Sequence, residues 1–198
     1  MNRSHIIYLS YLLFFVIFVG SIFVIPLLAF DHDMTYFYDV LSNTCHQKLS
    51  RSLCIFSDTT SYWIGDCTAQ TGDYVPGGTD RHIISVEGSG FIGYKMPVCA
   101  RDVGIYVAML LGALAYPLMR DINDRRVYHA IYLIIAIIPI GFDGGLQLGS
   151  DIGILPFAYE STNLIRLITG GIAGFASSIY AIPVLVNMFS NEFRRNKN

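Results

Sequence analysis

Two pairs of side chains in this sequence have types and spacing that suit metal binding. Cys45 and His46 are adjacent, and Cys99 and Asp102 lie three residues apart in the stretch MPVCARDVGIY at positions 96–106. Sulfur, imidazole and carboxylate groups are ligands of zinc and copper, and closed structural zinc sites use four ligands. If the fold brings the two pairs together, the sequence predicts a zinc or copper site.

The cysteines also allow a different chemistry. The chain has four, Cys45, Cys54, Cys67 and Cys99, and an even number fits disulfide bonds in an oxidising compartment. Four cysteines allow three pairings, and the sequence does not choose among them. The same residues therefore fit either a metal site or two bridges that staple a loop.

A second group of polar residues lies inside or beside apolar segments. Asp143 and Gln147 are four residues apart, and Asn163 and Arg166 are three apart, so each pair shares a helix face. With Arg101, we expect these side chains to form one polar layer at one end of a helical bundle. Charged groups at such depth are costly unless they are paired, and they often mark function.

Three roles for this polar layer remain open. It could support the metal ligands or bind a small molecule, or an Asp143–Arg166 or Asp102–Arg166 ion pair could fix the order of the helices. In a membrane enzyme for a lipid or small anionic substrate, Arg101 and Arg166 would bind the anion and Asp143 would be the acid or base. The sequence shows no arrangement of a nucleophile with a nearby base that would support such an enzyme.

Membrane helices must position these residues. The chain is 53% hydrophobic and 14% charged, with a mean hydropathy of +0.49, which is too apolar for an ordinary soluble domain. Segments 6–30, 103–119, 127–142 and 167–189 predict a four-helix transmembrane bundle, an all-α fold in a single domain over residues 1–198. The first segment is too long for a cleaved signal peptide and lacks a small-residue cleavage site.

The long loop at 31–98 carries its own elements. The apolar residues Phe37, Leu41, Cys45, Leu49 and Leu53 recur every four positions, which predicts an amphipathic helix lying on the membrane or on the other helices. The run HIISVE, GSG, FIGYK favours a short β-hairpin. The Ser-, Thr-, Asp- and Gly-rich part at 57–78 is expected to be irregular.

Small residues predict which spans touch. Gly104, Ala108 and Gly112 recur every four residues in the second span, as do Gly170, Gly174 and Ser178 in the fourth. Such stripes allow close helix contact in membranes. We therefore expect the second and fourth spans to pack together.

Basic residues predict the orientation. Arg3, the connection at 120–126 and the tail at 194–197 carry the positive charges of the short segments, so the multi-pass chain is expected in the cell membrane with both termini cytoplasmic and the loop at 31–98 outside. The lipid bilayer and other membrane subunits are the expected partners. A net charge of −2 without a basic patch argues against nucleic acid.

Four motifs resemble a known family. They are CHQ at 45–47 followed by Arg51-Ser52, MPVCARDVGIY at 96–106, PIGFDGGLQ at 139–147, and STNLIRLITGGIAG at 161–174. In this order they resemble the prokaryotic membrane-protein family called domain of unknown function 2085. The resemblance implies a small polytopic membrane protein with the pattern Cys-His-Gln, Cys-x-Arg-Cys-x-Gly-Ile-Tyr, Asp-Gly-x-x-Gln and Asn-x-x-Arg, and it implies no activity.

The chain departs from that family pattern twice. Asp102 stands where the family has the second cysteine of a C-x-x-C pair, which argues against a dithiol redox role because a carboxylate can bind a metal but cannot form a disulfide. A longer insert between Ser52 and Met96 holds Cys54 and Cys67, which would form a local bridge. In a non-catalytic subunit of a larger membrane complex, the second bridge would be Cys45–Cys99.

Overall fold

The computed structural model describes residues 2–42, 48–58, 60–68, 84–88 and 90–195. Within them, four helices are long and apolar enough to cross a membrane: α1 (Arg3–Leu28), α4 (Ala100–Met119), α5 (Ala130–Asp151) and α6 (Asn163–Arg195). The four predicted spans are confirmed. The third helix extends nine residues beyond its predicted end at 142. The additional turns include Asp143 and Gln147, which are buried against the rest of the protein.

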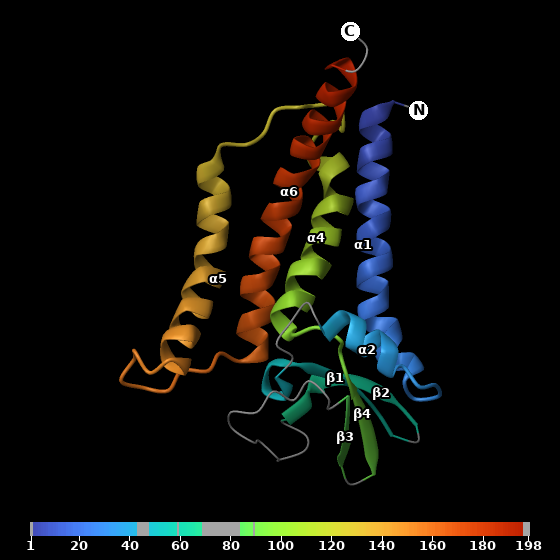
Figure 1. The fold of residues 1–198 in the computed structure, drawn as a ribbon, viewed down its shortest axis with the longest axis vertical. Coiled ribbons are helices and arrows are strands. Elements are labelled where there is room, and N and C mark those ends of the chain that lie inside the picture. The colour runs from blue at the N-terminus through green and yellow to red at the C-terminus, as the bar shows by residue number, and fades with distance from the viewer. Residues whose placement is uncertain (1, 43–47, 59, 69–83, 89, 196–198) are drawn as a thin grey trace.

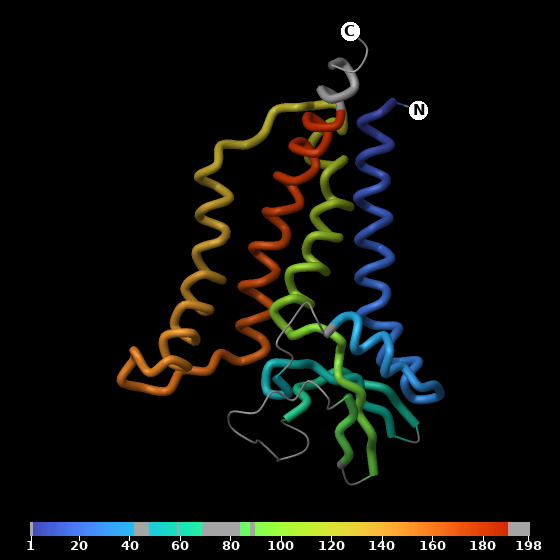
Figure 2. The backbone as a smooth tube through the Cα atoms, viewed as in Figure 1, coloured from blue at the N-terminus to red at the C-terminus, as the bar shows by residue number. Residues whose placement is uncertain are grey.

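The helices form a bundle with two distinct ends. Figure 1 shows α1, α4 and α6 close together, with α5 standing on the outer side of α6. Both chain termini and the connection between α4 and α5 lie at one end, which we call the termini end, and the strands lie at the other, the sheet end (Figure 2). Consequently α4 and α6 run parallel, and both begin at the sheet end.

Glycines bring α4 and α6 into backbone contact. A methyl group added at Gly104, Gly170 or Gly174 would overlap a carbonyl oxygen of the opposite helix. Only residues without a side chain allow this approach, which is how small-residue stripes act in membrane helices. The predicted contact between the second and fourth spans is confirmed.

A small antiparallel sheet occupies the segment between α1 and α4. Its strands are β1 (Leu53–Ser57), β2 (Tyr62–Asp66), β3 (Ser85–Gly88) and β4 (Phe91–Lys95), in the order β2-β1-β4-β3. The hairpin of β3 and β4 was predicted. The expectation that the chain is irregular from residue 57 was wrong for β2, because pairing with the apolar strand β1 organises a segment whose own composition resembles a loop.

Strand β1 joins the sheet to the bundle. Leu53 and Ile55 pack against Ile22 of α1, Val103 of α4 and the linker residue Val98. The alternate side chains Cys54 and Phe56 face a second cluster within the sheet, as the period-2 geometry of a strand requires. The sheet is therefore packed onto the helices by its central strand.

A short helix, α2 (Thr35–Ser42), follows α1, and a 3-10 turn at Leu49–Arg51 precedes β1. The predicted amphipathic helix is present but shorter than its predicted stripe: Leu49 lies in the 3-10 turn, and Cys45 lies outside the described residues. Tyr38 is buried and Phe37 is exposed, while Leu53 belongs to a strand. Burial against the end of α1 and the sheet selects the face, and periodicity alone does not contain that information.

Candidate functional site

Polar side chains gather at the sheet end, where α4 and α6 begin and α5 ends. Asp143, Gln147, Asn163 and Arg166 are all buried there. On α5, Asp143 and Gln147 are the two side chains that the described structure buries. The other residues of this helix are exposed or half-buried, so its deepest contacts with the rest of the chain are polar. We call the region of these four side chains the polar junction.

Arg166 lies at the centre of the polar junction, with 1% of its surface exposed. Its Nη1 donates to Asn163 Oδ1 at 3.0 Å and to the carbonyl oxygen of Ser50 at 3.3 Å. Its Nη2 lies 3.6 Å from the carboxylate of Glu160. Because a buried guanidinium is costly without partners, these contacts are what allow it to lie at this depth.

Gln147 connects Arg166 to a second arginine. With its amide oxygen facing the two guanidinium groups, Gln147 accepts from Arg166 Nη2 at 2.8 Å and from Arg51 Nη2 and Nε at 2.8 and 3.0 Å. Arg51 also pairs with Asp151 at 3.0 Å and lies 3.6 Å from Glu160. The polar layer predicted from the sequence lacks Arg51, Asp151 and Glu160, although Arg51 lies in one of the four motifs that resemble the family.

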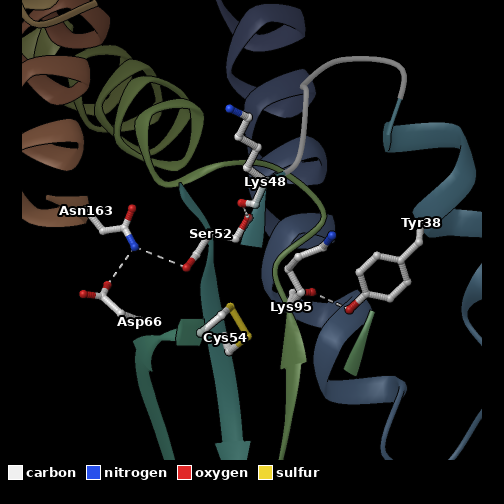
Figure 3. Close-up of a disulfide and its surroundings, with 8 residues drawn as sticks. Tyr38, Lys48, Ser52, Cys54, Asp66, Lys95 and Asn163 are labelled. Atoms are coloured by element: carbon white, nitrogen blue, oxygen red, sulfur yellow. Dashed lines mark hydrogen bonds between the residues drawn. A yellow bond between two sulfur atoms is a disulfide. The ribbon is translucent and has the colours of Figure 1, made fainter. Parts of the chain in front are cut away.

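Asn163 connects α6 to the sheet. Its side-chain nitrogen donates to Asp66 Oδ1 at 2.9 Å and to the carbonyl oxygen of Ser52 at 3.3 Å. Figure 3 shows both bonds beside Cys54, which follows Ser52 along the chain. The amide therefore holds the ends of β1 and β2 against the first turn of α6.

Asp143 is bonded on both of its oxygens. Arg101 forms an ion pair with Oδ2, and the Tyr159 hydroxyl donates to Oδ1 at 2.9 Å. This hydrogen bond raises the pKa of Tyr159, because the proton stabilises the neighbouring carboxylate. Asp143 pairs with Arg101 rather than with Arg166, so the ion pair expected from the sequence is formed by a different arginine.

Three buried donors in this region have no acceptor among the described residues: Arg101 Nε, Arg166 Nε and Ser161 Oγ. A buried donor without a partner costs about 1–3 kcal/mol. Water or a ligand oxygen would remove that cost. The polar junction can therefore donate further hydrogen bonds, beyond its internal contacts, to water or to a ligand oxygen.

Of the four predicted metal ligands, the described structure contains one pair. Cys99 caps the N-terminus of α4, and its Sγ donates to Asp102 Oδ2 at 3.1 Å. Cys45 and His46 lie outside the described residues. Within the described ranges, no group of three or more His, Cys, Asp or Glu side chains is placed to share a metal ion.

The local disulfide is present. Cys54 and Cys67 form an S–S bond of 2.07 Å that joins β1 to the residue after β2. This bridge was predicted and is confirmed. The alternative bridge Cys45–Cys99 includes a cysteine outside the part of the chain that the structure describes.

Comparison with known proteins identifies the family. Residues 89–180 match the family described as predicted membrane protein, DUF2085. An uncharacterized protein of Methanocaldococcus jannaschii is 33% identical over 195 residues, which cover 94% of this chain and 97% of that protein. No solved structure matches the chain. With four candidate spans and these two matches, the chain belongs to the DUF2085 family of membrane proteins.

Proposed function

We propose that the protein is a non-catalytic subunit of a larger membrane complex, in which the helical bundle holds the disulfide-bonded sheet rigidly at one face of the membrane. The observation that supports this function best is the polar junction. Its side chains bond to one another and to backbone carbonyls of the segment that enters the sheet. Three segments distant in the sequence are thereby fixed in one place.

The way these bonds are used favours a structural role. A catalytic acid or base needs an oxygen or nitrogen that can reach a substrate, whereas both oxygens of Asp143 are engaged by Arg101 and Tyr159. Both terminal nitrogens of Arg166 are likewise directed at protein acceptors. These contacts give less support to the alternative of an enzyme acting on an anionic substrate.

The orientation belongs to the same proposal. The connection between α4 and α5 carries Arg120, Arg125 and Arg126 and lies at the termini end with both chain ends (Figure 2). Basic residues in short loops face the cytoplasm. The sheet end would then lie outside the cell membrane. The Cys54–Cys67 bond supports this assignment because disulfides persist in oxidising compartments.

The test is the size and composition of the particle that contains the full chain. Extracted with mild detergent from cells that produce it naturally, the 22.1 kDa protein should migrate with a second polypeptide in fixed ratio. A particle of this chain alone would contradict the proposal.

Two variants on α6 sharpen the experiment. Asn163→Leu removes the hydrogen bonds that hold the sheet against α6. The variant should still insert in the membrane, but the second polypeptide should no longer migrate with it. Asn187→Leu is the matched control, because that amide donates to the Arg125 carbonyl at the termini end, and its partner should be retained.

A metal site at the sheet end is a second candidate, supported by the convergence of Cys99 Sγ and Asp102 Oδ2 at 3.1 Å. These donors suit zinc or copper, and the sequence adds Cys45 and His46 to complete the usual four ligands. Elemental analysis of the purified protein should find about one zinc or copper ion per chain. Absence of metal, or the same content in Cys99→Ser, would exclude this candidate.

A further inference from the structure

The short helix α2 divides its surface into three faces. Tyr38 and Leu41, three residues apart, turn toward the protein, and Tyr38 is 2% exposed. The polar residues Thr35 and Asp39 share a second face at a spacing of four. The third face carries Tyr36, Phe37 and Val40, which are 73%, 48% and 50% exposed.

The position of α2 relates the third face to the membrane. Tyr38 packs with Ile25 and Ala29 at the last turn of α1, and its hydroxyl donates to the Lys95 carbonyl at 2.6 Å. Figure 1 shows α2 across the sheet end of α1, between the bundle and the strands. The helix is therefore held at the height where the first span ends.

The apolar surface of the span continues beside α2. Val24, Leu27 and Leu28 in the final turns of α1 are exposed, as expected for side chains that face lipid tails. A second apolar face at this height, with a tyrosine in it, has the composition of residues that lie among lipid headgroups. If these three side chains faced water, the favourable free energy of removing their apolar surface from water would not be gained.

We propose that Tyr36, Phe37 and Val40 form a lipid-binding face that inserts into the headgroup region of the bilayer and fixes the height of the sheet above it. Helix α2 contains no lysine or arginine, so apolar burial rather than attraction to anionic lipid drives the insertion. The polar face with Thr35 and Asp39 then turns to water. This inference does not depend on the proposed function.

Tryptophan fluorescence tests the insertion on the full chain in phosphatidylcholine vesicles. Trp63 is the single tryptophan, so Trp63→Phe provides a dark background. Into it we would place Phe37→Trp, and Thr35→Trp as the matched control on the polar face. Melting curves of both variants check that each is folded.

The expected result is that the probe at position 37 emits at shorter wavelength and loses most of its intensity to lipids brominated near the carbonyls. It should resist aqueous iodide, and added anionic lipid should not change this. The probe at position 35 should behave in the opposite way. Quenching at position 37 by iodide, or protection there from both quenchers, would overturn the proposal, the latter because protein would then cover the face.

Discussion

At the residue scale, the burial of Arg166 is explained by acceptors that come from separate parts of the chain. Asn163 lies on its own helix, Gln147 on α5, and the Ser50 carbonyl at the entrance to the sheet. If the guanidinium were removed, Asn163 Oδ1 and the Ser50 carbonyl would lose this donor, while Gln147 would keep its bonds from Arg51. The buried hydrogen bonds of Arg166 therefore contribute more to stability than its ion pair with the partly exposed Glu160.

Arg166→Met should destabilise the folded chain by roughly 3 kcal/mol, because Asn163 Oδ1 and the Ser50 carbonyl lose a hydrogen-bond donor and Gln147 loses one of its donors. Thermal unfolding in detergent, compared with the wild type, measures the loss. Arg125→Met, in the exposed connection at the termini end, should change stability by less than about 0.5 kcal/mol. Equal effects of the two substitutions would show that the junction contacts contribute little.

Asp58 predicts a local pH dependence in the turn between β1 and β2. Hydrogen bonds from the backbone and hydroxyl of Thr60 and from Ser61 lower the pKa of this carboxyl. Because the folded-state pKa is lowered, the ionised carboxyl stabilises the turn at pH values above the ordinary pKa of about 3.9. This stabilisation is lost as the pH falls through the lower, folded-state pKa. The amide NMR signals of Thr60 and Ser61 should shift in that acidic window, and Asp58→Asn should abolish the shift.

At the element scale, the same residue type serves two purposes. Gly104 of α4 and Gly170 and Gly174 of α6 lie against the backbone of the opposite helix. An added methyl group at Gly141 or Gly145 of α5 would have no atom within 4 Å. The α4–α6 contact thus depends on the absence of side chains, whereas the buried side chains of α5 are the polar Asp143 and Gln147.

Gly174→Ala should separate α4 from α6 and cost about 1–3 kcal/mol, because the new methyl group overlaps the backbone of Ile105. Gly171→Ala is the control on the same helix, since its nearest neighbour would lie 3.9 Å away. It should be neutral or stabilising by up to about 1 kcal/mol, as alanine favours helix. In thermal unfolding, Gly174→Ala alone should lower the melting temperature; an equal loss in both variants would contradict the described contact.

At the scale of the whole molecule, two sets of contacts join the sheet to the bundle. Leu53 and Ile55 pack onto α1 and α4, and Asn163 holds the ends of β1 and β2 through Ser52 and Asp66. The Cys54–Cys67 bond lies beside these contacts (Figure 3). Loss of the disulfide should therefore affect the attachment of the sheet as well as the sheet itself.

The double substitution of Cys54 and Cys67 by alanine should lower stability by about 3 kcal/mol, the value expected for a closed loop of this size. A reductant should lower the melting temperature of the wild type to that of the double variant and leave the double variant unchanged. Cys99→Ala should keep the full response to reductant. If Cys99→Ala lost this response, a bridge that includes Cys99 would be responsible for it.

The sequence by itself determined the membrane class, the four spans, the α4–α6 contact and the helix and hairpin of the loop, because apolar length, small-residue spacing and turn residues are local properties. It also placed Asp143, Gln147, Asn163 and Arg166 at one end of the bundle through their depth in the spans. The fold decided their partners, since Arg51, Glu160 and Tyr159 lie in connecting segments without periodicity.

The tertiary structure likewise decided that Phe37 is exposed while Tyr38 is buried, and that residues 62–66 form a strand. Both outcomes depend on which surface of α1 or β1 lies opposite, and such pairings arise only when distant segments pack together.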